Sequence, residues 1–208
     1  YAFSYCKLHE TIVIPDSIKE ITMCAFANCE SLKSIVLPKK IKTIQFETFK
    51  GCTSLESIII PNGVNEIESS AFEGCSSLRS IVLPNSIVTI DDYAFANCTA
   101  LSLINIPRKV TIIQDYTFGN CSSLTEITLP DSIICIAESA FAECVSLTSI
   151  VIPEGVTNIE YEAFIDCKSL KNITIPKSVT SLDGNVFDGT QWLDDQQDGP
   201  IYINNCFY

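Results

Sequence analysis

The sequence predicts a mainly β, right-handed solenoid with short helical turns, built from about eight repeats of 23 residues and a C-terminal cap. Three residue types recur at this period along the 208-residue chain. Prolines stand at Pro15, Pro38, Pro61, Pro84, Pro107, Pro130, Pro153 and Pro176. Phenylalanines recur from Phe3 to Phe187, and cysteines from Cys6 to Cys167. A constant period of this length indicates repeats that bury their apolar side chains only by stacking on their neighbours.

The repeat predicts a single elongated domain over residues 1–208. Residues 1–188 are assigned to the repeats, the first of them truncated, because residues 1–6 match the middle of a repeat. We therefore expect a signal peptide, a cap or further repeats upstream. Residues 189–208 are predicted to form a cap-like final repeat. There Thr190 replaces the periodic cysteine, and the strand pair Ile201 and Ile203 comes late, after an extra loop.

Each repeat opens with a predicted half-buried strand, illustrated by residues 31–38. Ile35 and Leu37 alternate with Ser34 and Val36. Period-two alternation places Ile35 and Leu37 in the core and turns Ser34 and Val36 outward. Pro38 then ends the strand, because proline lacks the N–H group that a sheet ladder needs.

The second part of each repeat carries a spaced apolar pair, such as Ile41 and Ile44. Its β-branched bias favours a short extended segment on the opposite wall of the solenoid. The third part, residues 69–75 in one repeat, is predicted to be a single helical turn that places Phe72 and Cys75 on one face. The phenylalanine column is therefore expected to form a buried spine.

Composition excludes several classes of function. The net charge is −12 with only 13 Lys and Arg residues, so nucleic acid is a poor partner for this chain. No apolar run approaches the roughly 18 residues that a transmembrane helix requires. We therefore expect no nucleic-acid binding and no transmembrane segment.

The repeat Leu78–Pro84, followed by Ile87, Ile90, Ala94, Phe95 and Cys98, resembles the unit of BspA-like, or Treponema-type, leucine-rich repeats. The resemblance covers essentially the whole chain. It implies a fold of the leucine-rich-repeat class and a surface-exposed or secreted protein, sometimes linked to adhesion, from anaerobic or host-associated microbes. It also implies that the C-terminal segment is the family's terminal repeat.

No residue set points to catalysis, a metal or a cofactor. Stacked cysteines have parallel side-chain vectors about 4.8 Å apart, so the sequence favours buried thiols over disulfides. Cys135 shares a column with Glu20 and Thr43, and we expect it to be exposed and the first thiol to be labelled. His9 is the only histidine and lacks a catalytic partner. The C-terminal aspartates up to Asp198 are read as a solvated acidic cap, since their spacing does not fit an EF-hand.

The candidate binding residues lie on the outward side of the predicted strands. Val13, Val36, Ile59 and Val82 form an apolar column, rimmed by Lys33, Glu56 and Arg79. An apolar strip bordered by charge is typical of a protein-binding patch, although β-branched residues also suit any sheet surface. On another side, Tyr93 and Tyr116 stand in adjacent layers and either stack on each other or hold a sugar ring.

These patterns favour a non-enzymatic interaction module that binds a protein or glycan ligand, for example on a host cell, through its parallel-strand face. Cell-surface or secreted location follows from the resemblance alone. Two alternatives remain open. The chain is a structural spacer or stalk in a larger surface protein, or it is an intracellular scaffold, since free thiols also fit a reducing compartment.

Overall fold

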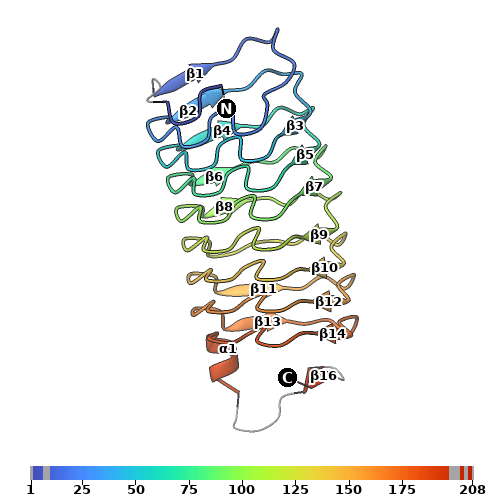
Figure 1. The fold of residues 1–208 in the computed structure, drawn as a ribbon. Helices are drawn as coiled ribbons and strands as arrows, with labels where there is room; N and C mark the ends of the chain where they lie inside the picture. Colours follow the sequence, from blue (N-terminus) through green and yellow to red (C-terminus); the bar gives the residue numbers. More distant parts are fainter. Residues whose placement is uncertain (1, 7–9, 197–201, 204–205, 208) are drawn as a thin grey trace.

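The computed structural model describes residues 2–6, 10–196, 202–203 and 206–207, and it confirms the predicted β-solenoid. His9 and Asp198 lie outside the described residues. Each layer of the solenoid contributes one segment to each of three walls, and the layers follow one another from β1 to β14 (Figure 1). The core lies between the walls, where the periodic Phe, Cys, Ile and Leu side chains are buried.

The first wall, here called the strand face, is made of parallel strands in the predicted places. Its strands are β1 (Thr11–Val13), β2 (Ser34–Val36), β4 (Ser57–Ile59), β6 (Ser80–Ile81), β8 (Leu103–Ile104), β11 (Ser149–Val151) and β13 (Asn172–Thr174). In β2, Ile35 is buried and Val36 exposed, and Leu37 after it is buried, as the alternation predicts.

The second wall contains the short extended segments that the β-branched pairs predict. Its strands are β3 (Thr43–Ile44), β5 (Glu66–Ile67), β7 (Thr89–Ile90), β9 (Ile112–Ile113), β10 (Cys135–Ile136), β12 (Asn158–Ile159) and β14 (Ser181–Leu182). They pair in parallel and in register within two sheets, β3–β5–β7 and β9–β10–β12–β14, with Ile44 opposite Ile67 and Ile67 opposite Ile90. The second residue of the pair therefore faces the core in layer after layer.

The third wall, here called the turn wall, differs in detail from the single helical turn expected for residues 69–75. The Cys75 N–H does donate to the Phe72 carbonyl oxygen, at 3.1 Å, as in a helical turn. However, Ser70 and Gly74 have φ values of 57° and 73°, and such left-handed residues break a helix into consecutive β-turns. The Phe72 N–H then points along the solenoid and donates to Ala94 of the next layer, at 2.8 Å.

The phenylalanine column forms the predicted spine inside the turn wall. Neighbouring rings from Phe3 to Phe187 stack with centroids 5.3–5.8 Å apart. Phe49 and its successors in the column are fully buried, whereas Phe3 in the first layer is 46% exposed. Burial of each ring stabilises the stack by about 1.5–3 kcal/mol, before any gain from ring packing.

The described part of the C-terminal segment contains α1 (Gln191–Asp194), β15 (Tyr202–Ile203) and β16 (Cys206–Phe207), the last two antiparallel. Thr190 takes the place of the periodic cysteine. Its hydroxyl donates to the Phe187 carbonyl oxygen (2.7 Å) and accepts from the Leu193 N–H (3.1 Å), so it caps α1. The Trp192 ring packs 5.0 Å from that of Phe187. The assignment of residues 189–208 as a cap and of 1–188 as the repeats stays a prediction.

Candidate functional site

The N-terminal half of the strand face carries an exposed apolar column, here called the apolar patch: Val13, Val36, Ile59 and Val82. Their side chains are 69%, 53%, 83% and 75% exposed. Val13 lies opposite Val36, and Val36 opposite Ile59, in the parallel register of β1, β2 and β4. Val82 directly follows β6, the strand next to β4. The four side chains therefore form one apolar strip on the surface.

A shallow hollow interrupts this strip between β4 and β6. The two strands are neighbours but belong to different sheets. A cavity of about 310 Å³ lies between them, and Ile59, Val82 and Pro84 are among the residues that line it. The apolar patch is thus a surface with a recess between Ile59 and Val82, where an apolar side chain of a partner could insert.

Three charged residues, Lys33, Glu56 and Arg79, were assigned to the rim of the patch from the sequence, and this role stays a prediction. All three are exposed. The Lys33 ammonium lies 2.9 Å from the Glu10 carboxylate, and this hydrogen bond raises the pKa of Lys33. Within the part of the chain that the structure describes, neither Glu56 nor Arg79 takes part in an ion pair. Their charges are therefore available to an outside partner.

Tyr93 and Tyr116 lie on the turn wall, so the structure does not bring them together with the other candidate residues. Both have left-handed backbone conformations, with φ values of 58° and 51°. Their ring centroids are 5.3 Å apart at an interplanar angle of 31°. The Tyr116 ring covers Gly119, where an added Cβ would come within 2.3 Å of the ring. The two rings therefore pack on each other and on the wall below them.

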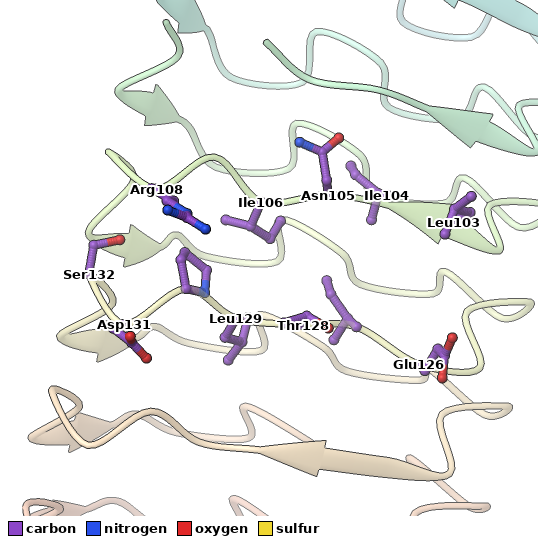
Figure 2. Close-up of a pocket in the computed structure, with 12 residues that line it drawn as sticks. Leu103, Ile104, Asn105, Ile106, Arg108, Glu126, Thr128, Leu129, Asp131 and Ser132 are labelled. Atoms are coloured by element: carbon purple, nitrogen blue, oxygen red, sulfur yellow. The ribbon is translucent and has the colours of Figure 1, made fainter. Parts of the chain in front are cut away.

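A larger cleft on the strand face was not predicted from the sequence. It lies between the layer of Leu103–Ile106 and the layer of Glu126–Leu129 and has a volume of about 730 Å³. Figure 2 shows the side chains that line it, with Glu126 toward one end and Arg108 and Ser132 toward the other. One signal was present in the sequence: Asn105 and Thr128 replace the β-branched apolar residues of the column.

The cysteine column is a structural ladder and not a set of nucleophiles. Each buried thiol donates to the carbonyl oxygen of the phenylalanine in the layer before it, as Cys75 does to Phe49 (3.2 Å) and Cys98 to Phe72 (3.2 Å). Burial raises the pKa of Cys52 and Cys98 to about 12. Thiols that stay protonated in this way react slowly with electrophiles at neutral pH.

Cys135 corrects one prediction, because it is half-buried instead of exposed. Its thiol donates to a Glu160 carboxylate oxygen at 3.4 Å. Burial and this carboxylate raise the pKa of Cys135 to about 11. Its reactivity at neutral pH is therefore lower than that of an ordinary exposed cysteine.

The described residues also bear on metal binding and on membrane insertion. No group of three or more His, Cys, Asp or Glu side chains is arranged there to hold a metal ion. Nor does any helix of the described part combine the length and apolar character that a membrane span needs.

The period, the three walls and the Phe and Cys ladders match a known repeat. The family model of the BspA type leucine-rich repeat region matches residues 1–123 and 89–197. This chain belongs to the BspA-type leucine-rich repeat family. Leucine-rich repeat proteins are generally protein-interaction modules and are typically non-catalytic.

Solved structures of bacterial leucine-rich repeat proteins show the same fold. A leucine-rich cell surface protein from Faecalibacterium prausnitzii is 31% identical, with a TM-score of 0.61 over 90% of this chain. The Treponema pallidum leucine-rich repeat protein is 30% identical, with a TM-score of 0.61 over 88% of this chain and 77% of its own. A protein from Eubacterium ventriosum is 25% identical, with a TM-score of 0.66 over 99% of this chain.

The chain spans 59% of the F. prausnitzii protein and 50% of the E. ventriosum protein. No curated protein shows significant similarity to it.

Proposed function

We propose that this chain is a non-enzymatic protein-binding module whose apolar patch, centred on Val36, Ile59 and Val82, is the binding surface. The observation that carries the proposal is the exposure of four β-branched apolar side chains in one column of adjacent strands. An apolar strip with a recess between two of its residues and charge at its rim has the anatomy of a protein interface.

The charged residues at the rim of the patch would fix the orientation of a bound partner. Glu56 and Arg79 lie in adjacent layers, carry opposite charges and are exposed. A partner with complementary charges would be aligned along the solenoid axis, because rim charges chiefly affect the association rate and the choice of partner. Val13 extends the apolar patch by one layer on the other side of Val36.

We place the module at a cell surface or in a secreted protein, with adhesion to a protein ligand, for example on a host cell, as its role. This placement is supported by the cell-surface description of the F. prausnitzii protein. A glycan is a second ligand class. It is supported by the half-exposed Tyr93 ring beside Tyr116, which offers a flat apolar face to a sugar.

The test is a triple variant, Val36→Glu/Ile59→Glu/Val82→Glu, against a partner first captured on the immobilised chain and then purified. The variant removes three apolar side chains that the partner would cover in the complex. Binding should weaken by about a hundredfold or more, since each of these side chains contributes roughly 1.5–3 kcal/mol when it is covered. Folding should be unaffected, because all three side chains are more than half exposed. Affinity is measured by surface plasmon resonance and folding by circular dichroism.

The matched control is Met23→Glu/Val88→Glu/Ile134→Glu, which adds the same charge at exposed positions off the strand face. It should bind as the unmodified chain does. Equal affinity of the patch variant and the unmodified chain would show that the apolar patch is not the interface. Failure to capture any partner from host-cell or bacterial extracts would favour a structural spacer, and capture of a cytoplasmic protein alone would favour an intracellular scaffold.

A further inference from the structure

The Tyr93 ring projects from the turn wall, and the small residues beside the tyrosine pair explain why. The Tyr116 ring covers Gly119, where an added Cβ would come within 2.3 Å of the ring. Ala96 occupies the matching position in the layer of Tyr93, 23 residues earlier, and carries such a Cβ. A ring placed as Tyr116 is would clash with it. This difference accounts for the angle of 31° between the two rings and for the 44% exposure of Tyr93.

One face of the Tyr93 ring is open to a ligand. The other face packs against Tyr116, with the two ring centroids 5.3 Å apart. On the open side the column continues with Ser70 in the layer before, a buried side chain that is too small to cover a ring. The face of an aromatic ring carries partial negative charge, so it attracts a cation placed over it.

Carboxylates border the tyrosine pair. Asp92 and Asp115 directly precede the two tyrosines in the chain, and Glu138 continues their column in the next layer. None of the three forms an ion pair with another described residue. Burial, and after it the charge of Asp92, raises the pKa of Asp115. A cation bound beside this column would reduce the repulsion between its carboxylates.

The neighbouring basic residue of the turn wall does not neutralise this column. Lys50 lies two layers before Tyr93, and its ammonium is held by two carboxylates, those of Glu47 (2.9 Å) and Glu73 (3.0 Å). The surroundings of the Tyr93 ring therefore keep a net negative charge. Such surroundings favour a cationic ligand over a neutral one.

We propose that the Tyr93 ring, together with the carboxylates of Asp92, Asp115 and Glu138, binds an arginine side chain of a partner protein. The planar guanidinium stacks on the open face of the ring, and its N–H groups donate to the carboxylates. Lysine fits less well, because an ammonium has no planar face to stack. This site lies on a different wall from the apolar patch and goes beyond the proposed binding of a protein there.

The experiment measures how a fluorescein-labelled octapeptide of alternating Gly and Arg binds the full chain, by fluorescence anisotropy at about 0.15 M salt. Tyr93→Ser should weaken binding by about three- to fivefold. The column accommodates serine, since Ser70 and Ser139 have φ values of 57° and 53° there. Asp92→Asn/Asp115→Asn should weaken binding by about tenfold or more, because it removes two charges at constant side-chain size. The matching peptide of Gly and Lys should bind about threefold more weakly than the Arg peptide.

The control variant Asp131→Asn/Glu154→Gln removes two charges from exposed positions away from the turn wall. It should bind the Arg peptide as the unmodified chain does. If it weakens binding as much as Asp92→Asn/Asp115→Asn does, a general attraction to a negatively charged protein explains the binding and the proposal is overturned. Equal affinities of Tyr93→Ser and the unmodified chain, or of the Lys and Arg peptides, would overturn it as well.

A neutral sugar chain, cellohexaose, tests the other ligand class at the same ring. Cellohexaose binding that Tyr93→Ser abolishes and Asp92→Asn/Asp115→Asn preserves, without binding of the Arg peptide, would assign the ring to a glycan and overturn the proposal. The triple variant of the apolar patch should bind the Arg peptide with unchanged affinity. Failure of the arginine site therefore leaves the proposed function of the patch in place, and failure of the patch leaves the arginine site.

Discussion

The turn wall and the strand face share one 23-residue period but differ in how firmly their layers are joined. On the turn wall, interlayer hydrogen bonds run from the Phe3 N–H to Ala25 (2.8 Å) through to the Asp166 N–H to Asp188 (2.7 Å). On the strand face the ladder stops between β4 and β6 and again after β8. The wall with constant residues thus holds the stack together, and the wall with varying residues has the clefts.

The largest expected effect comes from replacing a phenylalanine of the buried column, which tests whether the turn wall carries most of the stability. Phe95 is fully buried and stacks between Phe72 and Phe118, so Phe95→Ala should lower the free energy of unfolding by about 3–5 kcal/mol. Val82→Ala removes a 75% exposed side chain from the strand face and should change it by no more than about 0.5 kcal/mol. Urea unfolding followed by circular dichroism measures both. Similar losses in the two variants would show that the strand face carries as much stability as the turn wall.

The second test uses the thiols, whose ladder belongs to the turn wall. Because burial raises the folded-state pKa of Cys52 and Cys98 from 9.0 to about 12, these groups stabilise the fold fully below pH 9. Above pH 9 the unfolded chain loses the protons and the folded chain keeps them. The free energy of unfolding should then fall by about 1.4 kcal/mol per pH unit for each such thiol, until about pH 12.

Urea unfolding at pH 8.0, 9.5 and 10.5 measures how the free energy of unfolding changes with pH. Cys98→Ala should reduce this slope by the contribution of one thiol, about 1.4 kcal/mol per pH unit. The strand face offers no equivalent group among the described cysteines. A slope that Cys98→Ala leaves unchanged would mean that the ladder thiols ionise in the folded protein.

The repeat made most of the fold predictable, because burial in each layer follows from local alternation and each layer repeats it. Ile35, Phe72 and Cys75 are buried as their spacing predicts. The turn wall was less predictable. One of its two left-handed columns holds residues as different as Glu47, Ser70 and Tyr93, so no residue preference marks it. The other column holds mostly Gly, Asn or Asp, which favour this conformation, and it was therefore readable from the sequence.

The clefts were harder to foresee than the patch, for a physical reason. Exposure of Val36 or Ile59 depends on the period of its own strand, whereas a break in a ladder depends on how two whole layers are spaced. Sequence spacing therefore predicts which side chains of a strand are exposed, but it does not predict how far apart two layers lie. The trace of the cleft in the sequence is the change from Val82 to Asn105 and Thr128 in one column. The side-chain geometry was needed to show what Asn105 does there.

The smallest expected loss of stability is that of a variant at Asn105. On this part of the strand face the Asn105 side chain makes the hydrogen bonds that the backbone makes elsewhere. The Leu83 N–H donates to the Asn105 side-chain oxygen (2.8 Å), and the Asn105 amide donates to the Leu83 carbonyl oxygen (2.9 Å). In the first layers the corresponding Ile14 N–H donates to a backbone oxygen, that of Val36, at 3.0 Å. Asn105→Val restores the common residue of the column and removes both side-chain bonds.

Since each hydrogen bond contributes about 0.5–1.5 kcal/mol and the backbone can remake one of them, Asn105→Val should cost about 1 kcal/mol. Hydrogen exchange of the Leu83 amide reports the local change, with the turn-wall amide of Phe95, which bonds to Thr117 at 3.0 Å, as the internal reference. Faster exchange at Leu83 with unchanged exchange at Phe95 is the expected result, because the turn wall stays joined when the strand face loosens. If the Phe95 amide also exchanges faster, the two walls open as one unit, and the separation of stability from specificity between them is wrong.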